Sequence, residues 1–289
     1  MYKTLDLTNP QNSDIKYKIS NFPDGQQSIT LDKLDIGSRL GIILLKSRLN
    51  SFKDLELIIT ANQCLKEFGI EDVNLFVPYF LGARSDRKFG EGETNYLKNV
   101  ICPIINSQQF NRVIVLDPHS DVLEACLDNF TKISNFELVK FALESIGKDG
   151  VTLISPDAGA FKKIFDVAKE FGIESIITAT KVRDMKTGNI LHTDVPGIDQ
   201  HNKVKYVIID DICDGGRTFT EIAKSIHNVR PTAEIYLVVT HGIFSAGFAE
   251  LKKYFNGIFT TNSVKEIGEV EADSYGKIHT TNIKQLNIF

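Results

Sequence analysis

Short apolar runs alternate with longer amphipathic stretches along most of the chain. Gly41–Lys46 and Arg112–Leu116 are apolar runs with the length of a buried strand. Asp54–Phe68 instead repeats its apolar residues at helical spacing and is followed by Gly69, a typical stop signal. Further segments with these patterns predict strands over Val73–Val77, Val151–Ile154, Ser175–Thr178, Val204–Ile209 and Ile235–Val239, and helices over Thr94–Ile105, Ala158–Phe171 and Thr218–His227.

This alternation predicts an α/β protein with parallel sheets flanked by helices, which bind ligands at the carboxyl ends of their strands. Two segments look alike. Arg112–Leu127 and Lys205–Ile222 are each an apolar strand that ends in an acid, followed by a polar turn and a helix. The repeat supports two related domains, which we divide near Asn135 into residues 1–134 and 135–289.

Composition narrows the function classes. The 289 residues are 42% hydrophobic, enough for a sizeable core, and the net charge of −4 disfavours sequence-independent nucleic-acid binding. We find no apolar run long enough for a membrane span and no signal-peptide core, and expect a cytoplasmic protein. Four scattered cysteines without metal-finger spacing predict reduced thiols: Cys64, Cys102, Cys126 and Cys213.

The segment Val207–Thr220, VIIDDICDGGRTFT, combines acids and glycines after a strand. Glycines let backbone N–H groups approach a phosphate, and a helix N-terminus adds a positive dipole. Carboxylates before such a loop can accept hydrogen bonds from ribose hydroxyls. The pattern therefore favours a bound sugar phosphate over an acidic turn that Asp214 merely caps. The candidate residues are Asp210, Asp211, Asp214, Gly215, Gly216, Arg217 and Thr218.

This loop resembles the phosphoribosyl-binding loop of type I phosphoribosyltransferases and of ribose-phosphate pyrophosphokinases. Their common form is D-D-x-x-D-T-G-G-T, and this chain has D-D-I-C-D-G-G-R-T. Gly215 replaces the threonine, and Arg217 stands where a glycine is expected. The resemblance implies two phosphoribosyltransferase-like (Rossmann-like) domains, with the sugar phosphate on the C-terminal one and the nucleotide on the N-terminal one.

Two segments resemble the pyrophosphokinases and not the transferases. FPDGQ (Phe22–Gln26) is similar to the F-x-D-G-E segment that holds adenine, and PYFLGARSDR (Pro78–Arg87) to P-Y-x-x-Y-A-R-Q-D-R. Arginine suits a triphosphate because its fork pairs with phosphate oxygens bidentately. Gln26 replaces a glutamate and Ser85 a glutamine. The implied ATP-binding residues are Phe22, Asp24, Gln26, Arg84, Ser85, Asp86 and Arg87.

Three more segments resemble that family. DPHSD and SPDAG imply His119 and Asp157 as residues on the metal side; the alternative role of Asp157 is that of a helix N-cap. TKVRD resembles the mobile K-R-R segment, which implies Lys181 and Arg183 as the catalytic cations, with Val182 departing from the pattern. THGIFS (Thr240–Ser245) resembles T-H-P-I-F-S, to which we assign a structural role with contacts between subunits.

The resemblance implies an enzyme that transfers the β,γ-diphosphate of ATP, with Mg²⁺, to the C1 hydroxyl of a 5-phosphorylated ribose and releases AMP. The acceptor is either ribose 5-phosphate or ADP-ribose, since Arg217 adds a cation to the loop; the second product would feed NAD synthesis. A homo-oligomer, dimer or hexamer, is also implied. Two alternatives stay open: a type I phosphoribosyltransferase, and a non-catalytic regulatory relative of the pyrophosphokinases.

Overall fold

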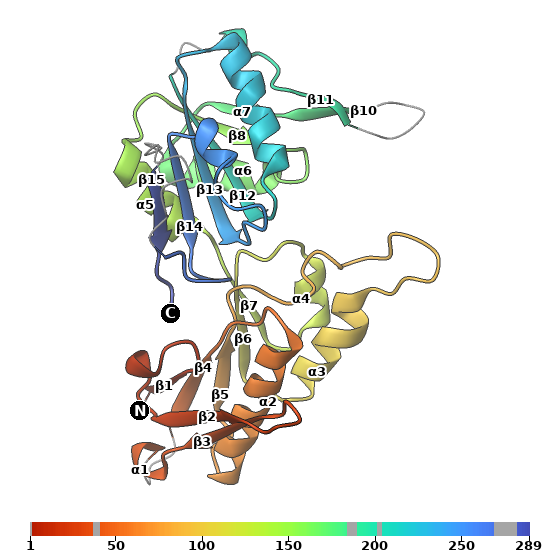
Figure 1. Ribbon diagram of the computed structural model, residues 1–289, viewed down its shortest axis with the longest axis vertical. Coiled ribbons are helices and arrows are strands. Elements are labelled where there is room, and N and C mark those ends of the chain that lie inside the picture. The colour runs from red at the N-terminus through yellow and green to blue at the C-terminus, as the bar shows by residue number, and fades with distance from the viewer. Residues whose placement is uncertain (1, 37–40, 184–189, 201–203, 269–281) are drawn as a thin grey trace. The chain divides into compact units, whose positions relative to one another are not determined.

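The computed structural model of the chain describes residues 2–36, 41–183, 190–200, 204–268 and 282–289. It separates into two compact units, Met1–Ser134 together with Phe289, and Asn135–Ile288. Each unit has its own parallel β-sheet flanked by helices (Figure 1), so the predicted fold class is confirmed. No helix in the described ranges combines the length and apolar character that a membrane crossing requires.

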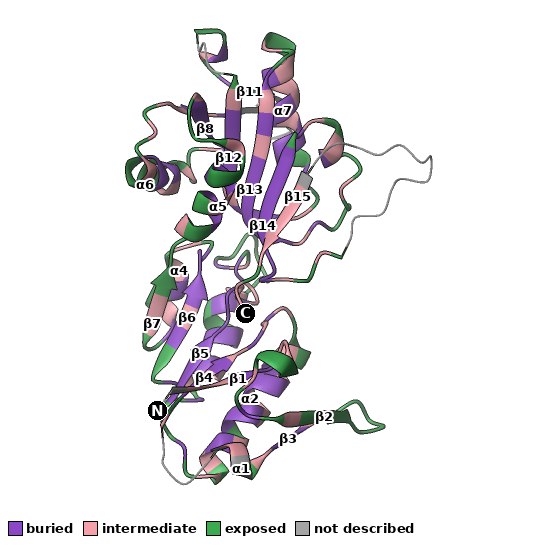
Figure 2. Cartoon of the chain, turned by 90° about the vertical axis from the view of Figure 1, so that its left-hand side faces the viewer, coloured by how far each residue is buried: buried purple, intermediate pink, exposed green. Residues whose placement is uncertain are grey.

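The sheet of the first unit has the order β1-β4-β5-β6-β7, and all neighbours are parallel. Strand β5 is buried along its whole length, whereas β4 and β6 mix buried residues with half-buried and exposed ones (Figure 2). The strands are β1 (Tyr2–Asp6), β4 (Ile42–Lys46), β5 (Val73–Phe76), β6 (Arg112–Leu116) and β7 (Phe130–Ile133). The α-helices are α1 (Lys33–Ile36), α2 (Phe52–Glu67), α3 (Cys102–Asn106) and α4 (Val122–Cys126).

Helix α2 lies close to its predicted range because its sequence encodes both ends. Ser51 and Asp54 form a capping box in which each side chain accepts a hydrogen bond from the other residue's backbone N–H. Gly69 follows the last turn at φ +77°, a conformation that glycine adopts without strain. The predicted helix over Thr94–Ile105 is different: its ordered turns begin with a π-helical segment, η2 (Leu97–Ile101), and continue into α3.

An antiparallel hairpin of β2 (Tyr17–Asn21) and β3 (Gln27–Leu31) stands apart from this sheet. It packs on α2 through Ile29 and Leu31, both buried in the core of the unit. The hairpin was not predicted, because β2 is mostly exposed and has no apolar run. A short 3-10 turn, η1 (Pro10–Asn12), precedes it.

The sheet of the second unit has the order β15-β14-β13-β12-β8-β9, again parallel throughout. Its strands are β8 (Val151–Ser155), β9 (Ile176–Thr178), β12 (Lys205–Cys213), β13 (Glu234–Gly242), β14 (Gly257–Thr261) and β15 (Asn282–Leu286). The remaining elements are α5 (Phe136–Ile146), α6 (Phe161–Phe171), α7 (Arg217–Val229), the 3-10 turns η3 (Ile198–Gln200) and η4 (Leu251–Lys253), and an antiparallel pair, β10 (Thr180–Arg183) with β11 (Ile190–Asp194).

Alternate residues of β12 pack into two separate hydrophobic clusters. Ile208 packs in the cluster that contains the apolar side chains of α7, while Val207 and Ile209 pack in the cluster that contains those of α5 and α6. This alternation explains the continuous apolar run, since both faces of a parallel strand are covered.

Strand β12 is longer than predicted. The prediction ended it at Ile209, but the strand continues to Cys213 and stays paired with β13 as far as Gly242. Ile212 and Cys213 are buried, so apolar residues continue the strand beyond the two acids. Asp210 and Asp211 therefore lie within β12, which extends beyond the predicted end at Ile209.

Candidate active site

The turns that follow β5 and β6 lie at the same edge of the first sheet, because these strands are parallel neighbours. Leu116 N–H donates to Pro78 O at 3.2 Å, which joins the starts of the PYFLGARSDR and DPHSD segments. Gly82 has φ +82°, and an added Cβ would lie 2.7 Å from the Tyr96 ring. This glycine is therefore required for the path of the arginine-bearing turn.

Asp86 connects the two segments. Its side chain is 5% exposed, and its Oδ1 accepts a hydrogen bond from Arg87 Nε at 3.1 Å. Burial alone would raise the pKa of Asp86, but the neighbouring Ser120 hydroxyl, the Arg87 guanidinium and the charge of His119 outweigh it and hold that pKa below its usual range. The predicted residues Asp86, Arg87 and His119 are thus one electrostatic cluster, to which Ser120 is an addition that the sequence did not suggest.

The FPDGQ segment is the turn of the β2–β3 hairpin. Phe22 and Gln26 close it with a hydrogen bond from Phe22 N–H to Gln26 O at 2.8 Å, and Asp24 Oδ1 accepts from Gln26 N–H at 3.2 Å. Gly25 adopts φ +95°. The Phe22 side chain remains 52% exposed. A fixed turn that presents an exposed ring can stack a nucleobase.

In the second unit, Asp210 and Asp211 are adjacent acids at the carboxyl end of β12. Asp210 Oδ1 accepts a hydrogen bond from Asp211 N–H at 2.9 Å. Burial and the Asp211 carboxylate raise the pKa of Asp210 well above its usual value, and the Lys163 ammonium opposes this only in part. Lys163 on α6 was not predicted; the sequence gives no sign that it lies near this pair.

The next residues form a loop that presents its backbone donors. Gly216 caps α7 at φ +79°, and an added Cβ would lie 3.0 Å from Leu251 Cδ2. In the described part of the chain, no hydrogen bond is made by the backbone N–H groups of the four residues Gly215–Thr218, whereas those of Phe219 and Thr220 donate to Gly216 O. Four such donors at a helix N-terminus can bind an anion. Arg217 is exposed at the first helical position.

Asp157 closes the turn that precedes α6, but it is not the N-cap of that helix, which is Ala160. Asp157 Oδ1 accepts from Gly159 N–H at 3.0 Å and from Ala160 N–H at 3.1 Å, just before α6. His119 and Asp157 belong to different units. In the ranges that the structure describes, no three potential metal-ligand side chains gather in one place. The assignment of these two residues to a metal therefore stays a prediction.

Lys181 and Arg183 lie on β10, where their backbones pair with Thr193 and Ile190 of β11. The register shifts between Val182 and Arg183. Their side chains lie outside the described part of the structure, so the catalytic role predicted for these two cations stays a prediction. The residues that follow, 184–189, are outside the described ranges as well.

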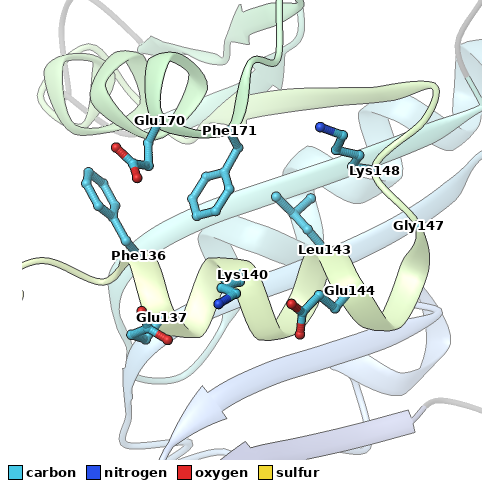
Figure 3. A pocket seen from close by; sticks show the side chains of 9 residues that line it. All are labelled: Phe136, Glu137, Lys140, Leu143, Glu144, Gly147, Lys148, Glu170 and Phe171. Atoms are coloured by element: carbon cyan, nitrogen blue, oxygen red, sulfur yellow. The ribbon is translucent and has the colours of Figure 1, made fainter.

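A cavity of about 640 Å³ lies elsewhere in the second unit (Figure 3). Helix α5 and the end of α6 line it, together with the turn before β8. That turn is at the amino end of the sheet, whereas the loop after β12 is at the carboxyl end, so the cavity is not part of the candidate site. Its lining residues are Phe136, Glu137, Lys140, Leu143, Glu144, Gly147, Lys148, Glu170 and Phe171.

Two parallel α/β units with acidic and glycine-rich turns at the carboxyl ends of their strands define the class of phosphoribosyltransferase-like proteins. The fold is similar to the crystal structure of phosphoribosylpyrophosphate synthetase from Mycobacterium smegmatis, with a TM-score of 0.78 and 16% identity, over 98% of this chain and 94% of that chain. No protein-family model matches the chain.

The chain is also similar in sequence to curated ribose-phosphate pyrophosphokinases. That of Vibrio parahaemolyticus is 23% identical over 93% of this chain and 84% of its own length. That of Pyrococcus abyssi is 25% identical over 90% and 89%. A putative ribose-phosphate pyrophosphokinase 2 of Streptococcus pyogenes is 28% identical over 86% and 76%. The resemblance to this family is confirmed, and with it the prediction of a pyrophosphokinase-type enzyme.

Proposed function

We propose that the protein transfers the β,γ-diphosphate of ATP to the C1 hydroxyl of a 5-phosphorylated ribose and releases AMP. The observation that carries the proposal is the cluster in the first unit, where Asp86 holds Arg87 beside His119. A phosphoribosyltransferase needs no such triphosphate-binding cations, and the curated relatives are named as pyrophosphokinases. The similarity covers most of the chain.

Each site matches one reactant. Arg84, Arg87 and the exposed Phe22 ring suit the triphosphate and the base of ATP. The loop N–H groups after β12 suit the 5-phosphate, because they are donors that the described residues leave without an acceptor. Asp210 and Asp211 suit the ribose hydroxyls as hydrogen-bond acceptors.

In the proposed reaction, the C1 oxygen attacks the β-phosphorus, and the hydroxyl proton passes to water. The bond between the β-phosphorus and the oxygen bridging to the α-phosphorus breaks, and AMP leaves with that oxygen. Both reactants are anionic, so the chain's main tasks are alignment and charge neutralisation. Lys181 and Arg183 are the proposed cations for the charge that develops on the transferring group.

The donor set at the nucleotide side fits Mg²⁺ that is bound largely by phosphates. Mg²⁺ in nucleotide sites keeps several waters and takes only one or two protein ligands. His119 of the first unit and Asp157 of the second are the residues that we propose for contacts of this kind. When bound, the ion would neutralise phosphate charge and hold the triphosphate in one geometry.

The acceptor is either ribose 5-phosphate or ADP-ribose, the latter giving ADP-ribose 1-diphosphate for NAD synthesis. Arg217 supports the larger acceptor, because an exposed guanidinium beside four loop N–H groups offers a second phosphate a partner. A glycine at this position would allow a closer wrap around a single terminal phosphate.

Release of AMP from Mg·ATP with each acceptor tests the proposal directly. Wild-type protein should release AMP with at least one of the two, and Arg217→Gly should lower kcat/KM for ADP-ribose by about tenfold relative to ribose 5-phosphate, the effect of losing one charged hydrogen-bonding partner. The matched control is Lys169→Ala, which removes a cation from α6. Alanine is chosen there because glycine would disturb the helix. No AMP with either acceptor would refute the function.

A further inference from the structure

The turn that follows β13 holds the start of the sugar-phosphate loop. Ile243 N–H and Phe244 N–H both donate to Cys213 O, at 2.9 and 3.1 Å. Ser245 N–H donates to Asp214 O at 3.2 Å, and the Ser245 hydroxyl donates to Asp214 Oδ1 at 2.6 Å. Four hydrogen bonds therefore connect two turns that follow neighbouring parallel strands.

The backbone of this turn is strained, and close packing around it maintains the strain. Phe244 has φ +46°, which is strained for a residue with a side chain, and it is 3% exposed. Its ring packs against Phe248 with centroids 4.6 Å apart. An added Cβ on Gly242 would lie 2.1 Å from the Phe244 ring, so this position must be glycine. Strain of this kind is typical of segments that position functional groups.

The strand behind the turn is anchored as well. His241 is 2% exposed, and its Nδ1 lies 2.9 Å from Ser263 Oγ. The Ser263 hydroxyl also lies 3.2 Å from Thr240 O, to which it donates. These contacts fix the end of β13 to the residues that follow β14, and so they anchor the turn after β13.

We propose that Ser245 is a positioning residue for the sugar-phosphate loop: its hydroxyl holds the Asp214 carboxylate away from the loop N–H groups. An aspartate readily accepts hydrogen bonds from backbone N–H groups one to three residues further along the chain. Released from Ser245, the Asp214 carboxylate can turn toward Gly216 and Arg217 and occupy the anion site itself. The hydrogen bond from Ser245 keeps those donors available to a phosphate.

The inference rests on the proposed function, since it takes the loop after β12 to be the acceptor site. It goes beyond that function in assigning to THGIFS a part in substrate binding, where the sequence suggested only a structural role. It also yields a specific expectation: loss of the hydroxyl should affect the acceptor and not ATP.

Ser245→Ala is compared with Ser245→Thr, which keeps a hydroxyl, and with Ser145→Ala, which removes a hydroxyl that bonds Phe141 O on α5. Calorimetric titration with ribose 5-phosphate and with inorganic phosphate measures binding without catalysis. Ser245→Ala should bind both about tenfold more weakly, as expected for one hydrogen bond to a charged group. Ser245→Thr should restore binding, and the KM for ATP should stay unchanged in all three variants.

A double-mutant cycle with Asp214→Ala separates positioning from general loosening of the fold. Once Asp214 is gone, removing the Ser245 hydroxyl should have no further effect on phosphate binding. Equal losses in both backgrounds, or binding by Ser245→Ala equal to that of wild type, would overturn the inference. Wild-type protein that binds ribose 5-phosphate but releases no AMP with either acceptor would instead refute the proposed function alone. Wild-type protein that binds neither ribose 5-phosphate nor inorganic phosphate would refute the inference too.

Discussion

Asp86 in the first unit and Asp210 in the second are acids with opposite electrostatic surroundings. Asp86 has Arg87 and His119 as neighbours, and its pKa lies below the usual range. Burial and the neighbouring Asp211 carboxylate raise the pKa of Asp210 well above the usual range. The charged form of Asp86 is favoured by neighbouring cations of the chain, whereas the charged form of Asp210 is disfavoured by a neighbouring acid.

This difference shows what each site offers a ligand. In the first unit the acid orients side-chain cations, which can bind phosphate oxygens through residue-specific geometry. In the second unit the acids offer acceptors for hydroxyl donors, and the phosphate donors come from the backbone of the loop. One site therefore depends on the identity of side chains and the other on the path of the main chain.

The largest effect is expected at a residue that belongs to neither ligand-binding site. Lys181→Ala should lower kcat by about 10²- to 10³-fold, because it removes charge stabilisation that is needed in the transition state. Nucleotide affinity should change far less. A coupled assay of AMP release and equilibrium titration with ATP measure the two quantities. The matched control is Thr180→Ala, an exposed neighbour on the same strand; undiminished turnover in Lys181→Ala would refute the role.

The contrast between a side-chain site and a backbone site predicts a difference between two glycines of the loop. Gly216→Ala forces a residue with a side chain to φ +79° and brings its Cβ to 3.0 Å from Leu251. We expect a cost of about 1–3 kcal/mol, seen as an acceptor KM that is roughly 5- to 150-fold higher. Gly215→Ala should have a smaller effect, because its Cβ would meet only Ser245 Oγ at 3.9 Å.

Steady-state kinetics with ATP and the acceptor varied in turn measure both variants. The KM for ATP should stay near the wild-type value, since the loop belongs to the acceptor side. Equal effects of the two substitutions would contradict a site built from backbone conformation.

The sequence predicted the fold best where burial leaves a local pattern. Strands β4 and β6 are continuous apolar runs, and α2 carries its own capping residues, so their positions were close to those observed. The hairpin strand β2 was missed because it pairs only with β3 and is mostly exposed. The end of β12 was misplaced because two acids interrupt the apolar run before Ile212 and Cys213 resume it.

The candidate site shows the same limit more strongly. The segments carrying Arg87, His119 and Asp214 were recognisable from local motifs. Their partners were not: Ser120 lies beside Asp86, and Ser245 reaches Asp214 across 31 positions of sequence. Such contacts arise when neighbouring parallel strands bring their following turns together, and pairing of that range leaves no local signal in a sequence.

The smallest expected effect tests the electrostatic contrast itself, through stability in the absence of ligands. The lowered pKa of Asp86 means that its charge stabilises the fold above the unfolded-state pKa of about 3.9, a contribution that is lost as pH falls through the folded-state pKa. The raised pKa of Asp210 has the reverse sign: its contribution is complete below about pH 3.9 and is lost as pH rises through the folded-state pKa.

At about pH 7.5, Asp86→Asn should therefore lower the melting temperature by about 2–4 °C, and Asp210→Asn should raise it by a similar amount. Near pH 4.5 the loss in Asp86→Asn should persist, while the gain in Asp210→Asn should shrink because the wild-type acid becomes protonated. Differential scanning calorimetry at the two pH values measures these shifts, with Asp166→Asn on the exposed face of α6 as the matched control. If both variants melt below wild type at about pH 7.5, the two acids do not differ in the way that their surroundings indicate.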